Sequence, residues 1–202
     1  MKKSKLEAAE TRRRIVKTAA AEFRRNGIHA TGLSDVMAAA GLTHGGFYRH
    51  FDSKDQLVAE ACAAAVESNG ETTEALACDR DGNDALEAIV TRYLCTDSRD
   101  NRSEGCLFAG LGSELARSDD KIRAVATAGF LKFVDLIAAQ YRRTKPKTAK
   151  ARALVAASAM IGAVVMSRIV TDPELSAGIL HYTKKHLLKF LKGRGNPPAE
   201  AV

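Results

Sequence analysis

Residues 31–54, with the sequence TGLSDVMAAAGLTHGGFYRHFDSK, constrain the fold of this chain more than any other stretch. Apolar residues recur at helical spacing between Leu33 and Ala40, which predicts a short helix with one buried face. Gly41 follows this run, where a left-handed helix end favours a residue without a side chain. Thr43 then stands at the N-cap position of a second short helix. The stretch therefore predicts two short helices joined by a tight turn.

The second of these helices has two sides of different chemistry. Phe47 and Phe51 are four residues apart, so both are expected to point to the core. The other side presents two stripes at the same spacing, formed by His44, Gly45, Tyr48 and Arg49. Ser53 and Gln56 form a capping box that begins a further helix. This layout is typical of the recognition helix in a helix-turn-helix.

The composition agrees with a helical protein that binds a negatively charged partner. Aromatic residues make up 5% of the chain and tryptophan is absent, which favours close-packed helices over a β-sandwich. The formal net charge is +7, and a basic balance suits nucleic acid or an acidic membrane surface. Three consecutive arginines, Arg12, Arg13 and Arg14, precede the turn. They either contact phosphate or form a solvated basic face.

Helical periodicity extends over the rest of the chain. It predicts helices over residues 5–26, 55–76, 84–95, 106–117, 121–143, 146–170 and 173–192, with loops over 77–83 and 96–105. With the two short helices, the expected fold is all-α with about nine helices and no strand. The expected domains are a helix-turn-helix module at 1–54 and a helical C-terminal domain at 55–192, followed by a disordered tail at 193–202.

Several classes of protein are excluded or disfavoured. No G-x-S-x-G, HExxH or P-loop motif occurs, so we expect neither an enzyme nor a cofactor. The four cysteines form no CxxC pair, which predicts free thiols and no metal site. No apolar run follows the basic N-terminus, so no secretory signal is expected. The apolar run 153–166 is shorter than the ~20 residues that span a bilayer, which predicts a buried helix in a cytoplasmic protein without a membrane partner.

The sequence resembles the TetR-type transcriptional regulators over residues 11–60. The matching residues are Thr11, Arg12, Ile15, Phe23, Gly27, Ala39, Gly41, Leu42, Thr43, Phe47, Tyr48, Phe51 and Lys54. The resemblance implies a homodimer that places two recognition helices in successive major grooves of a palindromic double-stranded operator. It also implies a C-terminal domain that senses a signal. By the same resemblance, Tyr48 contacts a phosphate and Lys54 meets the DNA backbone from the start of the following helix.

The predicted DNA-binding residues combine this resemblance with the chemistry of the side chains. Hydroxyl groups and helix starts suit phosphate, and an arginine can bind a guanine edge through two hydrogen bonds. The full set is Thr31, Ser34, Thr43, His44, Gly45, Tyr48, Arg49, His50 and Lys54. His44 departs from the family, which often has Lys, Arg or Pro at this position. The pair Gly45–Gly46 indicates either close approach of the backbone to DNA or a loosely formed first turn.

The predicted sensing residues belong to the second domain. Cys106 falls at the first turn of a helix, where free N–H groups favour a thiolate. In some TetR-type repressors a cysteine in such a Gly-Cys-Leu sequence senses electrophiles or oxidants, and in others it only packs. Cys62, Cys78 and Cys95 lack this setting. An effector pocket would lie among the helices from residue 55 to residue 143. The candidate lining residues, which could instead be plain core, are Tyr93, Phe108, Phe130, Phe133 and Met160.

The last two helices carry apolar residues on two sides, and the core of the domain would cover only one of them. A symmetric mate could cover the second side, and small residues would allow close approach. The predicted dimer interface comprises Ser158, Ile161, Gly162, Val165, Ile169, Ile179, Tyr182 and His186. The alternative is that these residues are core only.

Together these features predict a DNA-binding regulator, in the first place a repressor that a small molecule or an electrophile releases from its operator. The alternative is a constitutive, architectural DNA-binding protein without an effector. The large apolar C-terminal part argues against the alternative, because DNA packaging alone does not need it.

Overall fold

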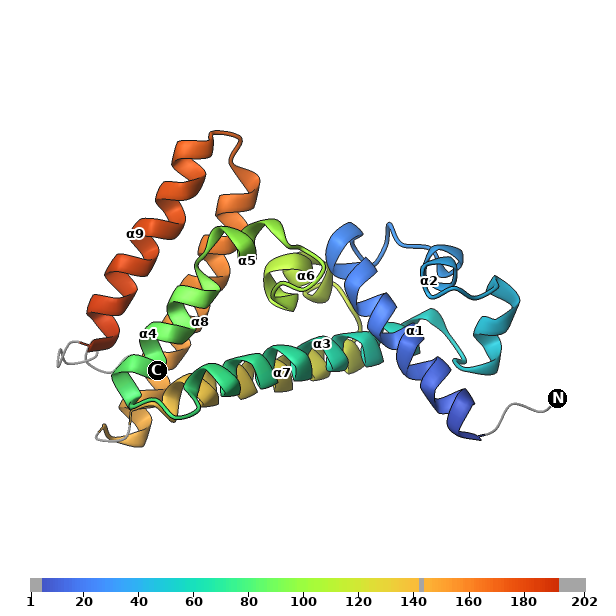
Figure 1. The fold of residues 1–202 in the computed structure, drawn as a ribbon, viewed down its shortest axis with the longest axis horizontal. Helices are drawn as coiled ribbons and strands as arrows, with labels where there is room; N and C mark the ends of the chain where they lie inside the picture. Colours follow the sequence, from blue (N-terminus) through green and yellow to red (C-terminus); the bar gives the residue numbers. More distant parts are fainter. Residues whose placement is uncertain (1–4, 142–143, 193–202) are drawn as a thin grey trace. The chain divides into compact units, whose positions relative to one another are not determined.

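The computed structural model describes residues 5–141 and 144–192, and within these ranges the chain is helical without a strand (Figure 1). The prediction of an all-α fold is confirmed. The helices are α1 Lys5–Asn26, α2 Leu33–Ala39, the 3-10 helix η1 His44–Arg49, α3 Lys54–Ala77, α4 Gly82–Tyr93, α5 Thr96–Asp100, α6 Leu107–Leu115, α7 Asp120–Ala138, α8 Pro146–Ile169 and α9 Pro173–Lys192.

The ends of these helices carry the capping residues that the sequence indicates. Gly41 has φ +69°, the left-handed conformation expected after α2. Pro146 is the first residue of α8, where its missing N–H leaves no bond unmade. The Asp172 carboxylate accepts hydrogen bonds from the N–H groups of Glu174 and Leu175, at 2.8 and 3.0 Å. These caps explain why most predicted boundaries lie within a few residues of the observed ones.

The helix α5 lies where only a loop was predicted. Cys95 is its N-cap residue, and the sulfur accepts a hydrogen bond from the N–H of Ser98 at 3.4 Å. Arg168 of α8 donates to the carbonyls of Ser98 and Arg99, both at 2.9 Å. Because polar contacts and not an apolar stripe hold this helix, hydrophobic periodicity could not find it. The described residues therefore form ten helices, one more than predicted.

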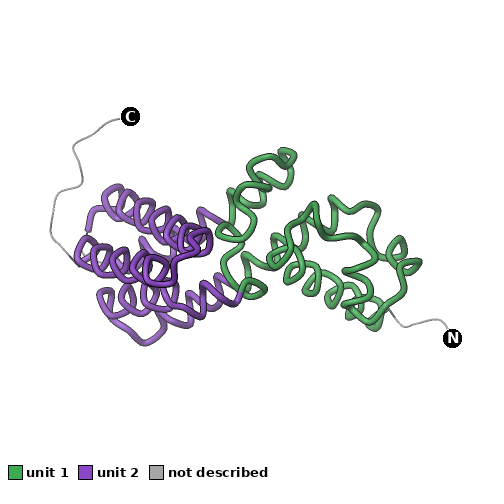
Figure 2. The backbone as a smooth tube through the Cα atoms, turned by 90° about the horizontal axis from the view of Figure 1, so that it is seen from above, with its two compact units in different colours: residues 1–68, 102–129 green, residues 69–101, 130–202 purple. Residues whose placement is uncertain are grey.

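The chain divides into two compact units (Figure 2). Unit 1 comprises Met1–Ser68 and Arg102–Gly129, and unit 2 comprises Asn69–Asn101 and Phe130–Val202. The predicted boundary at residue 54 coincides with the start of α3, but unit 1 continues beyond it and includes α6. The division into functional domains at this residue stays a prediction, and the predicted tail at 193–202 lies outside the described residues.

The core of unit 2 lies between α4, α8 and α9. Alanines along α8, among them Ala153, Ala156 and Ala157, are fully buried and allow neighbouring helices to approach closely. By length and composition α8 could cross a membrane, a test that core helices of soluble proteins also pass. Its packing against α9 and α5 makes it a core helix of this unit.

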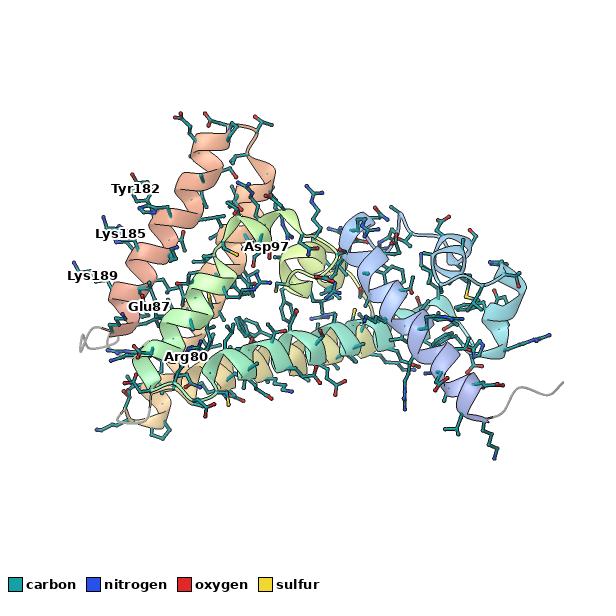
Figure 3. The ribbon with its side chains drawn as sticks, viewed as in Figure 1. Arg80, Glu87, Asp97, Tyr182, Lys185 and Lys189 are labelled. Carbon is teal, nitrogen blue, oxygen red and sulfur yellow. The ribbon has the colours of Figure 1, made fainter. Side chains whose placement is uncertain are left out.

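The outer side of α9 carries polar side chains. Figure 3 shows Tyr182, Lys185 and Lys189 pointing outward from this helix.

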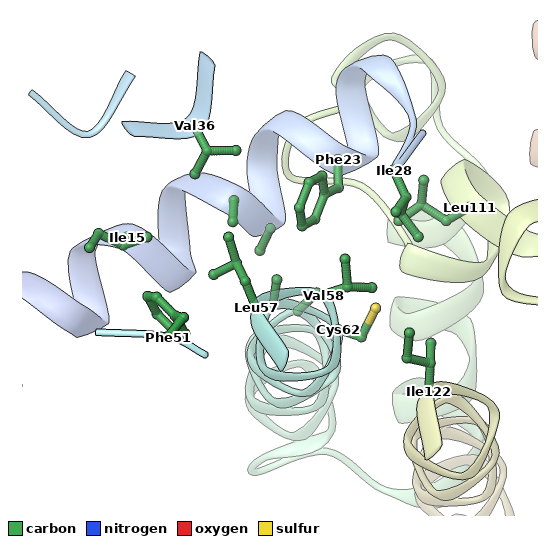
Figure 4. Packing of buried hydrophobic residues seen from close by; sticks show 14 of the residues in the cluster. Ile15, Phe23, Ile28, Val36, Phe51, Leu57, Val58, Cys62, Leu111 and Ile122 are labelled. Carbon is green, nitrogen blue, oxygen red and sulfur yellow. The ribbon is translucent and has the colours of Figure 1, made fainter. Parts of the chain in front are cut away.

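The core of unit 1 joins the front of the chain to α3, α6 and the start of α7 (Figure 4). Ile15 and Phe23 of α1 are at most 1% exposed. Leu57 and Cys62 of α3, with Leu111 of α6, belong to the same cluster. Burial of each large apolar side chain contributes about 1.5–3 kcal/mol relative to its exposure. This shared core explains why α6 belongs with the helix-turn-helix.

Candidate DNA interface and sensing residues

The predicted recognition segment forms the short 3-10 helix η1, which is anchored by Phe47 within it and Phe51 just after it, and not by a side-chain cap. Phe47 is fully buried, and its ring stacks on that of Phe51 with centroids 5.5 Å apart. Thr43 has the extended backbone of an N-cap residue, but its side chain makes no capping hydrogen bond. The predicted position of Thr43 is therefore confirmed, whereas the predicted side-chain cap is absent.

The outer side of η1 presents the two predicted stripes to solvent. The side chain of Tyr48 is 67% exposed and packs edge-on against Phe47. The other exposed residues of the predicted set are Ser34, Thr43, His44, Gly45 and Arg49. His50 is half-buried at the end of η1, and its carbonyl accepts a hydrogen bond from Arg12. Six of the nine predicted residues thus lie on the surface of α2, the turn and η1.

Thr31 and Lys54 make side-chain contacts within the protein that the sequence did not predict. Thr31 is 2% exposed, and its hydroxyl donates to the carbonyl of Gly27 at 2.6 Å. The predicted phosphate contact of Thr31 is therefore corrected, because the side chain is buried. The Lys54 ammonium donates to the carbonyls of Ile28 and Thr31, both at 2.7 Å. Its ammonium group therefore holds the α1–α2 loop, and a contact of Lys54 with the DNA backbone stays a proposal.

Arg12 is a structural residue that sequence reasoning left undecided. Its guanidinium makes a two-point ion pair with Glu60 of α3, one arm of which measures 2.7 Å. It also lies 4.5 Å from the centre of the Phe51 ring. The hydrogen bond to Glu60 raises the pKa of Arg12. Arg13 and Arg14 are exposed, so phosphate contact stays a proposal for these two.

The capping box at α3 is shifted by one residue from its predicted pattern. The Ser53 hydroxyl accepts the N–H of Gln56 at 3.1 Å, as predicted. The Gln56 side chain, however, accepts the N–H of Asp52 at 2.7 Å. The start of α3 is therefore fixed from both sides.

The predicted effector residues fall into different units. Cys106 and Phe108 belong to unit 1, whereas Tyr93, Phe130, Phe133 and Met160 belong to unit 2. Cys106 is the N-cap residue of α6 and is half-buried. In unit 2 the rings of Tyr93 and Phe133 stack with centroids 5.7 Å apart, and Met160 is fully buried. The six residues are therefore not one cluster within either unit.

The other cysteines differ in their settings. Burial raises the pKa of Cys62 to about 11, which agrees with its predicted position on a buried stripe. Cys95 was wrongly placed among cysteines without a special setting. Burial alone would raise its pKa, but hydrogen bonds from Ser98 and the nearby Arg92 lower it overall. The short helix that creates this setting was missed in the sequence, so its thiol was missed too.

The predicted dimer residues lie on a surface of unit 2 that the chain itself leaves open. Ser158, Gly162, Ile169, Tyr182 and His186 are exposed, while Ile161, Val165 and Ile179 are half-buried. Large apolar side chains are exposed on the same two helices, including Val155, Met166 and Leu175. We call the exposed residues of α8 and α9 named here the α8–α9 face.

A short helix with a buried phenylalanine pair and an exposed polar side, joined by a left-handed turn to a preceding helix, defines a helix-turn-helix DNA-binding protein. Comparisons with known proteins agree. The family model of bacterial regulatory proteins of the tetR family matches residues 15–61. The family model of the LmrA/YxaF-like transcriptional regulator C-terminal domain matches residues 83–175.

Individual relatives and a solved structure extend this result. An HTH-type transcriptional regulator of Mycobacterium tuberculosis is 32% identical over 174 residues, which cover 80% of this chain and 86% of that protein. The probable acrEF/envCD operon repressor of Escherichia coli is 42% identical over 59 residues, 29% of this chain and 27% of that protein. A TetR regulator from Chloroflexus aurantiacus has a TM-score of 0.76 at 28% identity, over 92% of this chain and 96% of the other. The chain belongs to the TetR family of transcriptional regulators, which are not enzymes.

Proposed function

We propose that this protein is a repressor that binds a palindromic operator as a homodimer and leaves the DNA when a small molecule or an electrophile binds. The observation that carries the proposal is η1, where the buried Phe47, together with Phe51 just beyond the helix, orients Tyr48 and Arg49 outward. Membership of a family of DNA-binding regulators, many of them repressors, supports it. Regulators of this family are in general soluble and cytoplasmic.

The proposed dimer forms through the α8–α9 face. Ile169 is 63% exposed and Tyr182 61% exposed, and burial of such large apolar side chains against a second copy would be favourable. A Cβ atom built at Gly162 would meet nothing within 4 Å, so this part of α8 is open to a neighbouring helix. The second copy would cover this apolar surface and place the two η1 segments for two half-sites.

The proposed electrophile sensor is Cys106, at the start of α6. Arg24 of α1 donates to the adjacent carbonyl of Gly105 at 3.3 Å. The Cys106 thiol would add across the C=C bond of an activated alkene: the C–S bond forms as the π bond breaks, the thiol proton goes to the neighbouring carbon, and the product adds bulk beside Arg24. Because α6 belongs to unit 1, such a change would act within the unit that contains η1. A second form of the proposal places a small apolar effector near Tyr93 and Phe133 in unit 2.

The main test is a gel shift with the DNA upstream of the protein's own gene. We expect a dimer to bind in a sequence-dependent way, with affinity that falls at least about tenfold between about 50 and 200 mM salt. Arg49→Ala should weaken specific binding about tenfold or more, because one base contact is lost. Arg117→Ala removes the same charge from an exposed site beyond α6 and should have little effect. Absence of a salt-sensitive, sequence-dependent shift would overturn the proposal.

The sensor is tested by release of bound DNA with N-ethylmaleimide. We expect the wild type and Cys78→Ser, which removes an exposed thiol, to release DNA, and Cys106→Ser to remain bound. Equal release from all three would exclude Cys106 as the sensor. If no thiol reagent releases DNA but the protein still binds its operator, the effector is a non-reactive small molecule, or the protein is a constitutive DNA-binding protein.

A further inference from the structure

The loop between α1 and α2, residues 27–32, is held by charged groups on both its carbonyls and its amides. On the carbonyl side, Lys54 donates to Ile28 and Thr31. On the amide side, the Glu114 carboxylate of α6 accepts the N–H of His29 at 2.9 Å. The same oxygen lies 2.7 Å from the His29 ring nitrogen Nδ1. One loop therefore joins α3 and α6 through two side chains of opposite charge.

The Glu114 carboxylate also lies directly against the end of α1. Gly27 has φ +93°, and a Cβ atom built there would lie 2.7 Å from Glu114 Oε1. Gly27 therefore provides both the left-handed helix end and the space for the carboxylate. Burial disfavours the charged carboxylate, but the hydrogen bonds from His29 lower the pKa of Glu114 overall. The fold thus maintains an ionised carboxylate at this position.

The rest of α6 lies along the last turn of α1. At the start of α6, Arg24 donates to the carbonyl of Gly105. In the middle, a Cβ atom built at Gly110 would lie 3.4 Å from the Arg24 carbonyl oxygen. Leu107, Leu111 and Leu115 bury the inner side of α6 in the core of unit 1. At the far end of α6, Glu114 adds the polar contact to His29, in the loop that leads into α2.

We infer that Glu114 couples α6 to the DNA-reading segment by its hydrogen bonds to the α1–α2 loop. The loop leads into α2, and α2 packs on η1, so a shift of α6 must either break the contact with His29 or move the loop. Glu114 is thus a positioning residue, and no DNA contact is assigned to it. This inference rests on the proposed function, because it names the path by which the signal reaches η1.

Coupling between two sites is reciprocal. If a change in the state of α6 alters the affinity for DNA by some factor, DNA binding must shift the equilibrium between the states of α6 by the same factor. We would therefore measure hydrogen–deuterium exchange of the α6 amides with and without saturating DNA from the protein's own upstream region. In the wild type, DNA should slow exchange in α6 by roughly fivefold or more. In Glu114→Gln a neutral amide oxygen replaces the carboxylate as the acceptor for His29, so this slowing should weaken clearly, while DNA still protects η1.

Two further variants separate coupling from stability. Glu67→Gln makes the same change at an exposed site on α3 and should behave as the wild type. His29→Ala removes the ring contact but keeps the backbone N–H, so part of the slowing should remain. A merely structural role of Glu114 would speed exchange throughout unit 1 and leave the effect of DNA on α6 intact.

The outcomes are distinct for the two proposals. If the wild type fails to bind DNA in the gel shift, the proposed function is wrong and the inference falls with it. If the wild type binds DNA but α6 does not respond, or responds equally in Glu114→Gln, the repressor proposal stands and the role of Glu114 is overturned.

Discussion

At the scale of single residues, Arg12 connects three parts of the DNA-binding module. It pairs with Glu60, donates to the carbonyl of His50 and covers Phe51. We expect Arg12→Ala to lower the free energy of unfolding by about 1–2 kcal/mol. The side chains of the pair are 36% and 32% exposed, so solvent screening limits the loss. Urea denaturation of the purified protein measures it.

The control for this prediction is the neighbouring exposed residue. Arg13→Ala should change the free energy of unfolding by less than about 0.5 kcal/mol, as surface substitutions usually do. In a double-mutant cycle with Glu60→Gln, the loss of stability in the double variant should be smaller than the sum of the two single losses, because each single variant already removes the ion pair. Equal effects of Arg12→Ala and Arg13→Ala would mean that the ion pair adds nothing to stability.

The same scale explains what the sequence could not predict at the DNA interface. Which side chains face outward follows from local spacing, and Tyr48 and Arg49 were predicted correctly in this respect. The roles of Arg12 and Lys54 depend on partners distant in the sequence, 48 and 26 residues away. No periodic pattern records such pairs. Thr31 was misjudged for the same reason, because its burial depends on how the loop folds back.

At the scale of elements, η1 contains a glycine that packing does not require. A Cβ atom built at Gly45 would meet nothing within 4 Å. Gly45→Ala should therefore fold normally and gain up to about 1 kcal/mol of stability. If the backbone approaches the DNA closely here, operator affinity should nevertheless fall, because the new methyl group occupies that space. Thermal unfolding and gel shifts on the same variant separate the two effects.

Gly41 provides the contrasting variant on the other side of the turn. Its φ of +69° strains any other side chain, although a Cβ atom built there would meet nothing within 4 Å. Gly41→Ala should destabilise the protein by about 1–2 kcal/mol.

For the Gly45→Ala variant, an unchanged DNA affinity would contradict close approach of the backbone to DNA. It would favour the alternative that Gly45 only loosens the first turn of η1.

Elements with an apolar stripe or strong caps were predictable, and elements held by polar contacts were not. The end of α1 follows from the glycine after it, and the start of α9 follows from its Asp-Pro pair. The helix α5 has no buried residue and depends on a hydrogen bond from Arg168 of α8, which is 69 residues away in the sequence. The 3-10 geometry of η1 was not predicted for a different reason, since the spacing of residues alone does not distinguish it from a short α-helix.

At the scale of the whole molecule, the compact units do not coincide with the expected domains. The sequence suggested a boundary at the start of α3, because the family motifs end nearby. Packing instead assigns α6 to the helix-turn-helix unit, through Leu107, Leu111 and Leu115. Such long-range packing is absent from local patterns. A signal at Cys106 or along α6 would therefore act inside unit 1.

The α8–α9 face gives the last prediction, on assembly. Ile169→Lys places a charge on this face, at a side chain that is 63% exposed and so contributes little to the monomer core. Because an apolar interface excludes an unpaired ammonium group, we expect this variant to sediment as a monomer at micromolar concentration. Its operator affinity should fall by more than about tenfold, since one recognition helix is lost from each complex.

Leu131→Lys is the matched control for the charge. Leu131 is 40% exposed on α7, outside the α8–α9 face, and the substitution adds the same positive charge to the protein. A gain in non-specific attraction to DNA is therefore equal in both variants, and only the loss of the mate distinguishes them. Analytical ultracentrifugation should find Leu131→Lys dimeric and Ile169→Lys monomeric. A dimer in both cases would place the interface elsewhere, and the two η1 segments would then be spaced by another surface of the chain.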